Sequence, residues 1–97
     1  MAFVQIIEFR SSKVDEMQAL GEEWAKATEG KRTVRRRILC QDREDPGRYF
    51  NIVMFDSYES AMQNSQLPET QSFSGEMQKL GDGPPTFYNL DVIEDRS

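Results

Sequence analysis

The sequence contains no histidine and only one cysteine, Cys40, among its 97 residues. The missing histidine removes the commonest general base, the commonest zinc ligand and the usual proximal haem ligand. It also excludes Ser–His and Cys–His nucleophilic pairs within the chain. One cysteine can form neither an intrachain disulfide framework nor a multi-cysteine zinc site. We therefore expect a protein that works without a cofactor, metal or haem.

Long hydrophobic runs are also missing. No apolar stretch approaches the roughly 20 residues that span a bilayer, and the first residues lack the basic region of a signal peptide. The net charge of −5 and the pI of about 4.7 argue against a general nucleic-acid or membrane binder. The length is that of one domain. We expect a single cytoplasmic domain over residues 1–97.

What the sequence does contain is a set of strands that are apolar on both faces. Residues 2–10, 49–55 and 87–93 have this pattern, and residues 33–41 are predicted as a further strand. Side chains alternate between the two faces of a strand. In the first three segments the odd-numbered residues therefore share one face, here called the odd face, and the even-numbered residues share the even face. The odd face carries three amides, Gln5, Asn51 and Asn89.

Helical spacing and turn-forming residues complete the order of elements. Ser12 is predicted to cap a first helix, Asp56 or Ser57 a second, and Pro68 to begin a third. The cluster 44–47, with Pro and Gly, joins the second and third strands as a hairpin. The resulting order, β-α-β-β-α(α)-β, predicts an α+β fold, a ferredoxin-like sandwich.

Helices in a chain this short can cover only one face of the sheet. We expect a second copy of the chain to cover the odd face, because soluble monomers rarely expose so much apolar surface. The amides would then line an amphiphilic cavity in a homodimer, which is a dimeric α/β barrel.

The register of the hairpin decides which residues of 33–41 join that face. If the hairpin is symmetric about the bond between Asp45 and Pro46, Arg36 and Cys40 lie on the odd face. A slip of one residue would place Arg35, Arg37 and Leu39 there instead.

Two stretches carry a resemblance to a known family. Residues 49–61 join an apolar strand, a short cap and a helix start of the form Ser-x-Glu-x-Ala, and residues 67–70 lead into Phe73. With the strand order, they make nearly the whole chain similar to the dimeric α/β-barrel superfamily, in particular the antibiotic-biosynthesis-monooxygenase-like group. That superfamily includes cofactor-free oxygenases of aromatic polyketides, haem-degrading enzymes and isomerases.

The resemblance also indicates which activities to expect. Haem-degrading relatives carry Asn, Trp and His where this chain has Gln5, Asn64 and a residue near Ser74, so haem chemistry is not expected. Quinone-forming relatives rely on Asn, Trp, Tyr and Arg, but Trp24 lies on the first helix and is predicted to be core. The resemblance implies a cofactor-independent monooxygenase or isomerase acting on a small aromatic or polyketide-like substrate. The alternative is a non-catalytic ligand-binding or structural dimer.

Each candidate residue has a functional and a structural interpretation. The amides either orient a phenolate or enolate or bond one another and water. Asp91 is either a base whose pKa is raised by burial or an exposed residue at a strand end, and the aromatic side chains form either a binding box or core. The predicted site comprises three catalytic candidates, Asn51, Asp91 and Tyr49, and five substrate-binding candidates, Gln5, Asn89, Arg36, Phe55 and Phe87.

Other features are open to more than one interpretation. The basic run 31–37 has three interpretations. It is either an anion clamp, a set of edge-strand charges that discourages aggregation, or a source of salt bridges in the dimer. Cys40 is either a nucleophile or a small packing residue. RNA-recognition modules share this element order, but residues 47–52 lack their alternating aromatic signature. We therefore expect no nucleic-acid partner.

Overall fold

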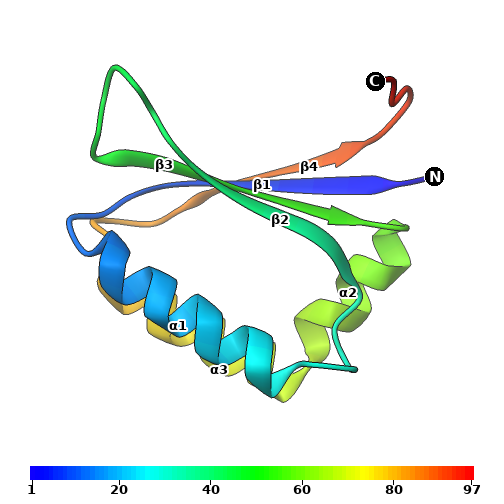
Figure 1. Ribbon diagram of the computed structural model, residues 1–97, viewed down its shortest axis with the longest axis horizontal. Helices are drawn as coiled ribbons and strands as arrows, with labels where there is room; N and C mark the ends of the chain where they lie inside the picture. Colours follow the sequence, from blue (N-terminus) through cyan, green and yellow to red (C-terminus); the bar gives the residue numbers. More distant parts are fainter.

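A computed structural model describes all of residues 1–97 and shows a four-stranded antiparallel sheet with three helices on one side (Figure 1). The strand order is β2-β3-β1-β4, and the predicted ferredoxin-like α+β fold is confirmed. No helix is both long and apolar enough to cross a membrane. The elements are β1 (Phe3–Arg10), α1 (Val14–Ala27), β2 (Val34–Gln41), β3 (Arg48–Phe55), α2 (Tyr58–Gln66), α3 (Pro68–Leu80) and β4 (Thr86–Asp91).

The helices begin where short polar side chains or proline favour them. The hydroxyl of Ser57 accepts the backbone N–H of Ser60 at the start of α2, and Pro68 occupies the first turn of α3. The prediction that Ser12 caps α1 is wrong. Instead the buried Ser11 hydroxyl accepts the N–H of Lys13 and donates to the carbonyl of Leu80, which ties the start of α1 to the end of α3.

The helices cover the odd face of the sheet, so the prediction that a second chain covers this face is wrong. Phe3, Phe9 and Phe55 are buried on the odd face, whereas Tyr88 and Leu90 on the even face are 43% and 45% exposed. Large aromatic side chains bury the most apolar area, and four of them in β1 and β3 point toward the helices. The open surface of the sheet is therefore the even face.

The core under the helices is divided into two parts. One part lies near α2 and contains Phe3, Val53, Phe55 and Ala61. The other contains Phe9, Met17 and Tyr49, with residues of α3 packed against them. Between the two parts the helices α1 and α3 pack on each other rather than closely on the sheet, which leaves space above the middle of the odd face.

The β2–β3 hairpin differs by one residue from the predicted register. Arg37 pairs with Val53, so Arg37 lies on the odd face and Arg36 lies on the even face. The physical reason is the loop, in which the Asp42 carboxylate accepts the backbone N–H groups of two following residues at 2.8 and 3.2 Å. A bulge between Val34 and Arg36 adds a further irregularity at the other end of β2. Cys40 also lies on the even face, opposite Phe50.

Candidate functional site

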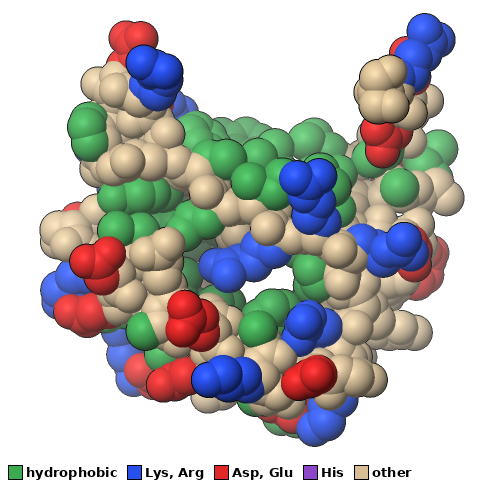
Figure 2. All heavy atoms as spheres, viewed as in Figure 1, with side chains coloured by type: hydrophobic (Ala, Val, Ile, Leu, Met, Phe, Trp, Pro, Cys, Tyr) green, Lys and Arg blue, Asp and Glu red, His purple; other side chains and the backbone are tan.

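A cavity of about 510 Å³ lies between the odd face of the sheet and the helices. Figure 2 shows the molecule hollowed between its strands and its helices. The volume is in the range of small-molecule sites. Aromatic and aliphatic side chains form much of the wall. Its polar side chains are Gln5, Arg37, Asn51, Asn64, Ser65, Thr70, Gln71, Ser74 and Gln78.

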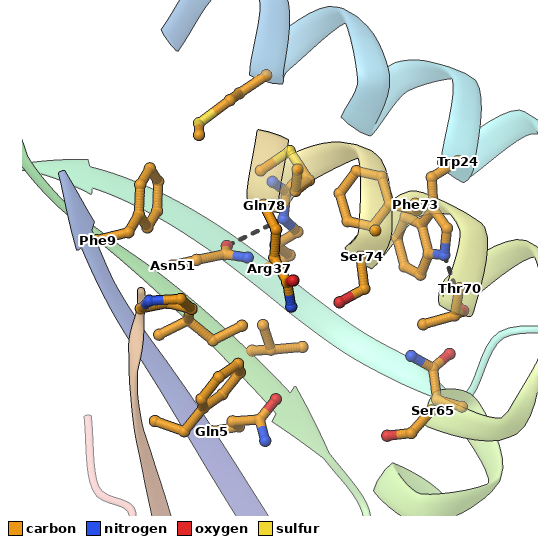
Figure 3. A pocket seen from close by; sticks show the side chains of 18 of the residues that line it. Gln5, Phe9, Trp24, Arg37, Asn51, Ser65, Thr70, Phe73, Ser74 and Gln78 are labelled. Atoms are coloured by element: carbon orange, nitrogen blue, oxygen red, sulfur yellow. Dashed lines mark hydrogen bonds between the residues drawn. The ribbon is translucent and has the colours of Figure 1, made fainter. Parts of the chain in front are cut away.

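Arg37 is the only charged side chain that lines the cavity. It comes from β2, and its Nε donates to Oδ1 of Asn51 at 3.0 Å (Figure 3). No carboxylate lies within salt-bridge distance of it. Burial lowers the pKa of its guanidinium group, but arginine keeps its proton in proteins. The half-buried charge is therefore unfavourable until an anion approaches it.

Asn51 is the partner that fixes the orientation of Arg37. It lies in the middle of β3 and is only 7% exposed. Because Arg37 can only donate, the amide oxygen of Asn51 must face it. No protein group accepts from the Nδ2 atom of Asn51, so this donor is left for a ligand or water. The pair thus presents N–H donors to the cavity from both members.

A polar stripe on α3 forms the opposite wall. Thr70, Ser74 and Gln78 recur every four residues, so they share one side of the helix, and all three line the cavity (Figure 3). These three residues were not among those predicted from the sequence, although their four-residue spacing is visible there. Trp24 was predicted to be core and is buried, yet it also lines the cavity. Its indole N–H donates to the Thr70 hydroxyl at 2.9 Å, and its ring stacks on Phe73.

Four of the predicted site residues do meet in the cavity: Asn51, Gln5, Phe55 and Phe87. Asn89 lies beside these residues but does not line the cavity. The Gln5 amide donates to the side-chain oxygen of Asn89 at 3.1 Å across β1 and β4. That contact fits the interpretation in which the amides bond one another, whereas Asn51 bonds the cavity arginine.

The other three predicted residues lie outside the cavity. Arg36 is exposed on the even face, because the register is one residue from the predicted one. Asp91 is exposed at the end of β4. Tyr49 is buried, with its ring stacked on Phe9 and its hydroxyl bonded to Gln41. No Asp, Glu, Lys, Tyr or Cys lines the cavity, so its walls offer charge stabilisation rather than a base.

The acidic residues are too dispersed to form a metal site. No group of three or more Cys, Asp or Glu side chains is placed to hold a metal ion. The polar groups of the cavity are amides, hydroxyls and one guanidinium, which suit an organic ligand with oxygen atoms better than a cation.

No family model matches the sequence, and no curated protein matches it either. Among solved structures, the cofactor-independent oxygenase SnoaB from Streptomyces nogalater, crystallised as a point mutant, superposes with a TM-score of 0.81 at 10% identity, covering 97% of this chain and 95% of that chain. Rv0793 from Mycobacterium tuberculosis superposes with a TM-score of 0.80 at 14% identity over 100% of both chains.

A third structure, from Caulobacter crescentus, is described as a candidate antibiotic biosynthesis monooxygenase. Its TM-score is 0.82 at 14% identity, over 96% of this chain and 91% of that chain. At such identities the likeness concerns the fold and not the activity. The chain therefore has the ferredoxin-like fold seen in proteins of the antibiotic biosynthesis monooxygenase group.

Proposed function

We propose that the protein is a cofactor-independent monooxygenase that oxidises a small aromatic or polyketide-like substrate in the cavity. The observation that carries this proposal is the Arg37–Asn51 pair, which presents free N–H donors to an aromatic-walled space of about 510 Å³. Donors of this kind stabilise negative charge as it develops on an oxygen atom. The fold shared with the oxygenase SnoaB is consistent with the proposal.

The reaction requires a substrate that forms an enolate. An anthrone loses a proton from its ring carbon, and the enolate gives its electrons to molecular oxygen, forming a carbon–oxygen bond. One oxygen atom stays as the new quinone carbonyl. The other leaves as water with the two hydrogens of that carbon. Molecular oxygen is the oxidant, so no further reductant or cofactor is needed.

The chain's own contribution is to stabilise the enolate. Since no side chain in the cavity wall can serve as a base near neutral pH, the proton passes to water. Arg37 and the Nδ2 group of Asn51 make this ionisation easier by binding the oxyanion. Asp91 and Tyr49 are outside the cavity and have no place in this scheme.

We also propose that a second copy of the chain covers the even face. Ile38, Ile52 and Ile6 lie side by side across the middle of this face, and Leu90 is 45% exposed beside them. An interface that covers the sheet should exceed about 1,000 Å². Light scattering should then give the mass of two chains, and a stable single chain at micromolar concentration would refute the homodimer.

Oxygen uptake with anthrone tests the proposed activity. We expect the protein to accelerate uptake, and Arg37→Gln to lower kcat/KM by about 100-fold, as for loss of one oxyanion donor. Arg36→Gln is the matched control, because the neighbouring arginine lies on the opposite face. No acceleration by the wild type, or equal rates for Arg37→Gln and Arg36→Gln, would overturn the proposal.

A non-catalytic binder of the same ligands is the second candidate function. It is favoured by the absence of a base among the lining residues. Binding of anthrone without any acceleration of oxygen uptake would support this alternative.

A further inference from the structure

We propose that the ligand of this cavity carries an anionic oxygen group before it binds, and that Gly21 is the positioning residue that seats Arg37 to receive it. The ligand class is a planar aromatic carboxylate or acidic phenolate. This inference rests on the proposed function for the aromatic part of the ligand. It adds a permanent anionic group that binds the free Nη donors of Arg37, while the Nδ2 group of Asn51 stays available to the enolate oxygen.

The first observation is the glycine itself. Gly21 is buried in the middle of α1, where glycine costs about 1 kcal/mol relative to alanine. Its φ is not positive, so the backbone does not require glycine there. A Cβ at this position would lie 2.9 Å from Nη1 of Arg37 and 3.6 Å from Cζ and Nη2. The helix therefore leaves out a side chain where the guanidinium group packs.

The second observation is the state of the guanidinium group. Its Nε–H is used by Asn51, and no protein acceptor bonds either Nη atom. The aromatic ring of Phe73 lies 6.0 Å from Cζ and contributes a cation–π contact. Helix α1 and Phe73 thus fix the plane of the group while its outer donors stay free. A planar, fixed guanidinium with two free donors matches the geometry of a carboxylate.

The third observation is that several exposed arginines of this chain are neutralised by carboxylates, whereas Arg37 is not. Arg10, Arg35 and Arg48 each form a salt bridge with a carboxylate at 2.7 to 2.9 Å. The side chains of these three arginines are 37% to 67% exposed. Arg37 is the one held inside the molecule without an anion. A ligand anion would supply the missing charge at a half-buried position, where the attraction is stronger than at the open surface.

The aromatic part of the ligand follows from the neighbouring walls. Phe9 lies on one side of the cavity, and the stacked Trp24–Phe73 pair lies on the other (Figure 3). The α3 stripe of hydroxyls and amides would bond further oxygen atoms on the rings. A fused bicyclic acid therefore satisfies the site better than an aliphatic one.

Calorimetric titration with naphthoate and with its neutral analogue naphthalenemethanol tests the inference. We expect the wild type to bind naphthoate at least about tenfold more tightly, the effect of a hydrogen-bonded charge pair. Arg37→Gln should abolish this preference. Gly21→Ala should reduce naphthoate affinity by about tenfold and leave the affinity for the alcohol unchanged, since it displaces only the guanidinium. Arg36→Gln, on the even face, is the control and should keep the preference.

The chain has a single tryptophan, so the indole N–H of Trp24 gives one nuclear magnetic resonance signal from the cavity wall. This signal should shift when naphthoate binds. Equal affinities for the two probes, no binding of either probe, or naphthoate binding that leaves the signal in place would overturn the inference. Gly21→Ala with unchanged naphthoate affinity would refute the role of Gly21. A failure of anthrone oxidation with the naphthoate preference intact would refute the oxygenase and leave the anion site.

Discussion

On the even face of the sheet Arg48 lies between two carboxylates, whereas on the odd face Arg37 faces the cavity with only an amide beside it. Arg48 bonds Glu8 at 2.7 Å and Asp42 at 3.1 Å, and the Tyr88 hydroxyl donates to the same Glu8. These partners raise the pKa of Arg48, while burial lowers that of Arg37. The arginine between two carboxylates organises the surface of the sheet, whereas the half-buried arginine without a carboxylate marks the site.

The two faces of the sheet also differ in what covers them. The odd face holds the amides and is covered by the chain's own helices, with a cavity over its polar centre. The even face is apolar in the middle and uncovered. A ligand is therefore expected on the odd face and a second chain on the even face.

The largest expected effect comes from a charge in the middle of the even face. Ile52→Asp should convert a dimer of two chains to a single chain, because an unpaired charge in such an interface costs about 3 kcal/mol or more. Light scattering measures the mass, and circular dichroism checks that the chain stays folded. Ile52→Val is the matched control and should remain dimeric. A dimeric Ile52→Asp protein would show that the even face is not the interface.

The next effect concerns the amide that orients the cavity arginine. Asn51→Ala should lower the free energy of unfolding by about 1–3 kcal/mol, since it leaves the Nε donor of Arg37 without its partner. Denaturant titration measures this change. Asn89→Ala is the control, because Asn89 is exposed and bonds only Gln5. Equal losses in the two variants would contradict the special role given to Asn51.

A paired substitution compares the two arginines directly. Arg48→Met should lower the thermal midpoint of the ligand-free protein, because it removes the partner of two carboxylates. Arg37→Met should lower the midpoint less, because removing a half-buried charge that no carboxylate compensates offsets part of the loss of the hydrogen bond to Asn51. Differential scanning calorimetry at neutral pH provides both values. A larger loss for Arg37→Met than for Arg48→Met would reverse the comparison.

The smallest effect is the acid dependence of the even face. Hydrogen bonds from Arg48 and Tyr88 lower the pKa of Glu8 below its ordinary value of 4.5. The stabilisation from this lowered pKa is present above pH 4.5 and is lost as the pH falls through the lower value in the folded protein. Glu8→Gln should therefore make the acid limb of the stability profile shallower. An unchanged profile would show that these bonds do not form in solution.

Much of the fold could be predicted from the sequence because the alternation in β1, β3 and β4 assigns every residue to a face. The alternation could not say which face the helices cover, since both faces are apolar. The size of the side chains would have indicated the covered face. Phe3, Phe9, Tyr49 and Phe55 all fall on the odd face, and Phe50 is the one aromatic residue of β1 and β3 on the even face.

The site was predictable only in part, for two physical reasons. Arg37, and not the predicted Arg36, lies on the odd face because the side chain of Asp42 sets the length of the hairpin loop. The pattern of apolar and polar residues does not reveal that contact. The polar stripe of α3 was overlooked because a polar helix side is ordinarily solvent-exposed. The place of Asn51 in the cavity wall could be predicted, since an amide within an apolar strand needs a partner in any arrangement. Its catalytic role stays a prediction.

The position of a bound aromatic acid would show whether Arg37 is the anion-binding group of the cavity. In a crystal structure with naphthoate, we expect its carboxylate at about 2.7–3.2 Å from an Nη atom of Arg37, with the rings in the cavity between Phe9 and Phe73. The second chain should lie on the even face of the same crystal. Naphthoate ordered elsewhere with the cavity free of it would refute the anion site, and a dimer built through the odd face would refute the assignment of the two faces.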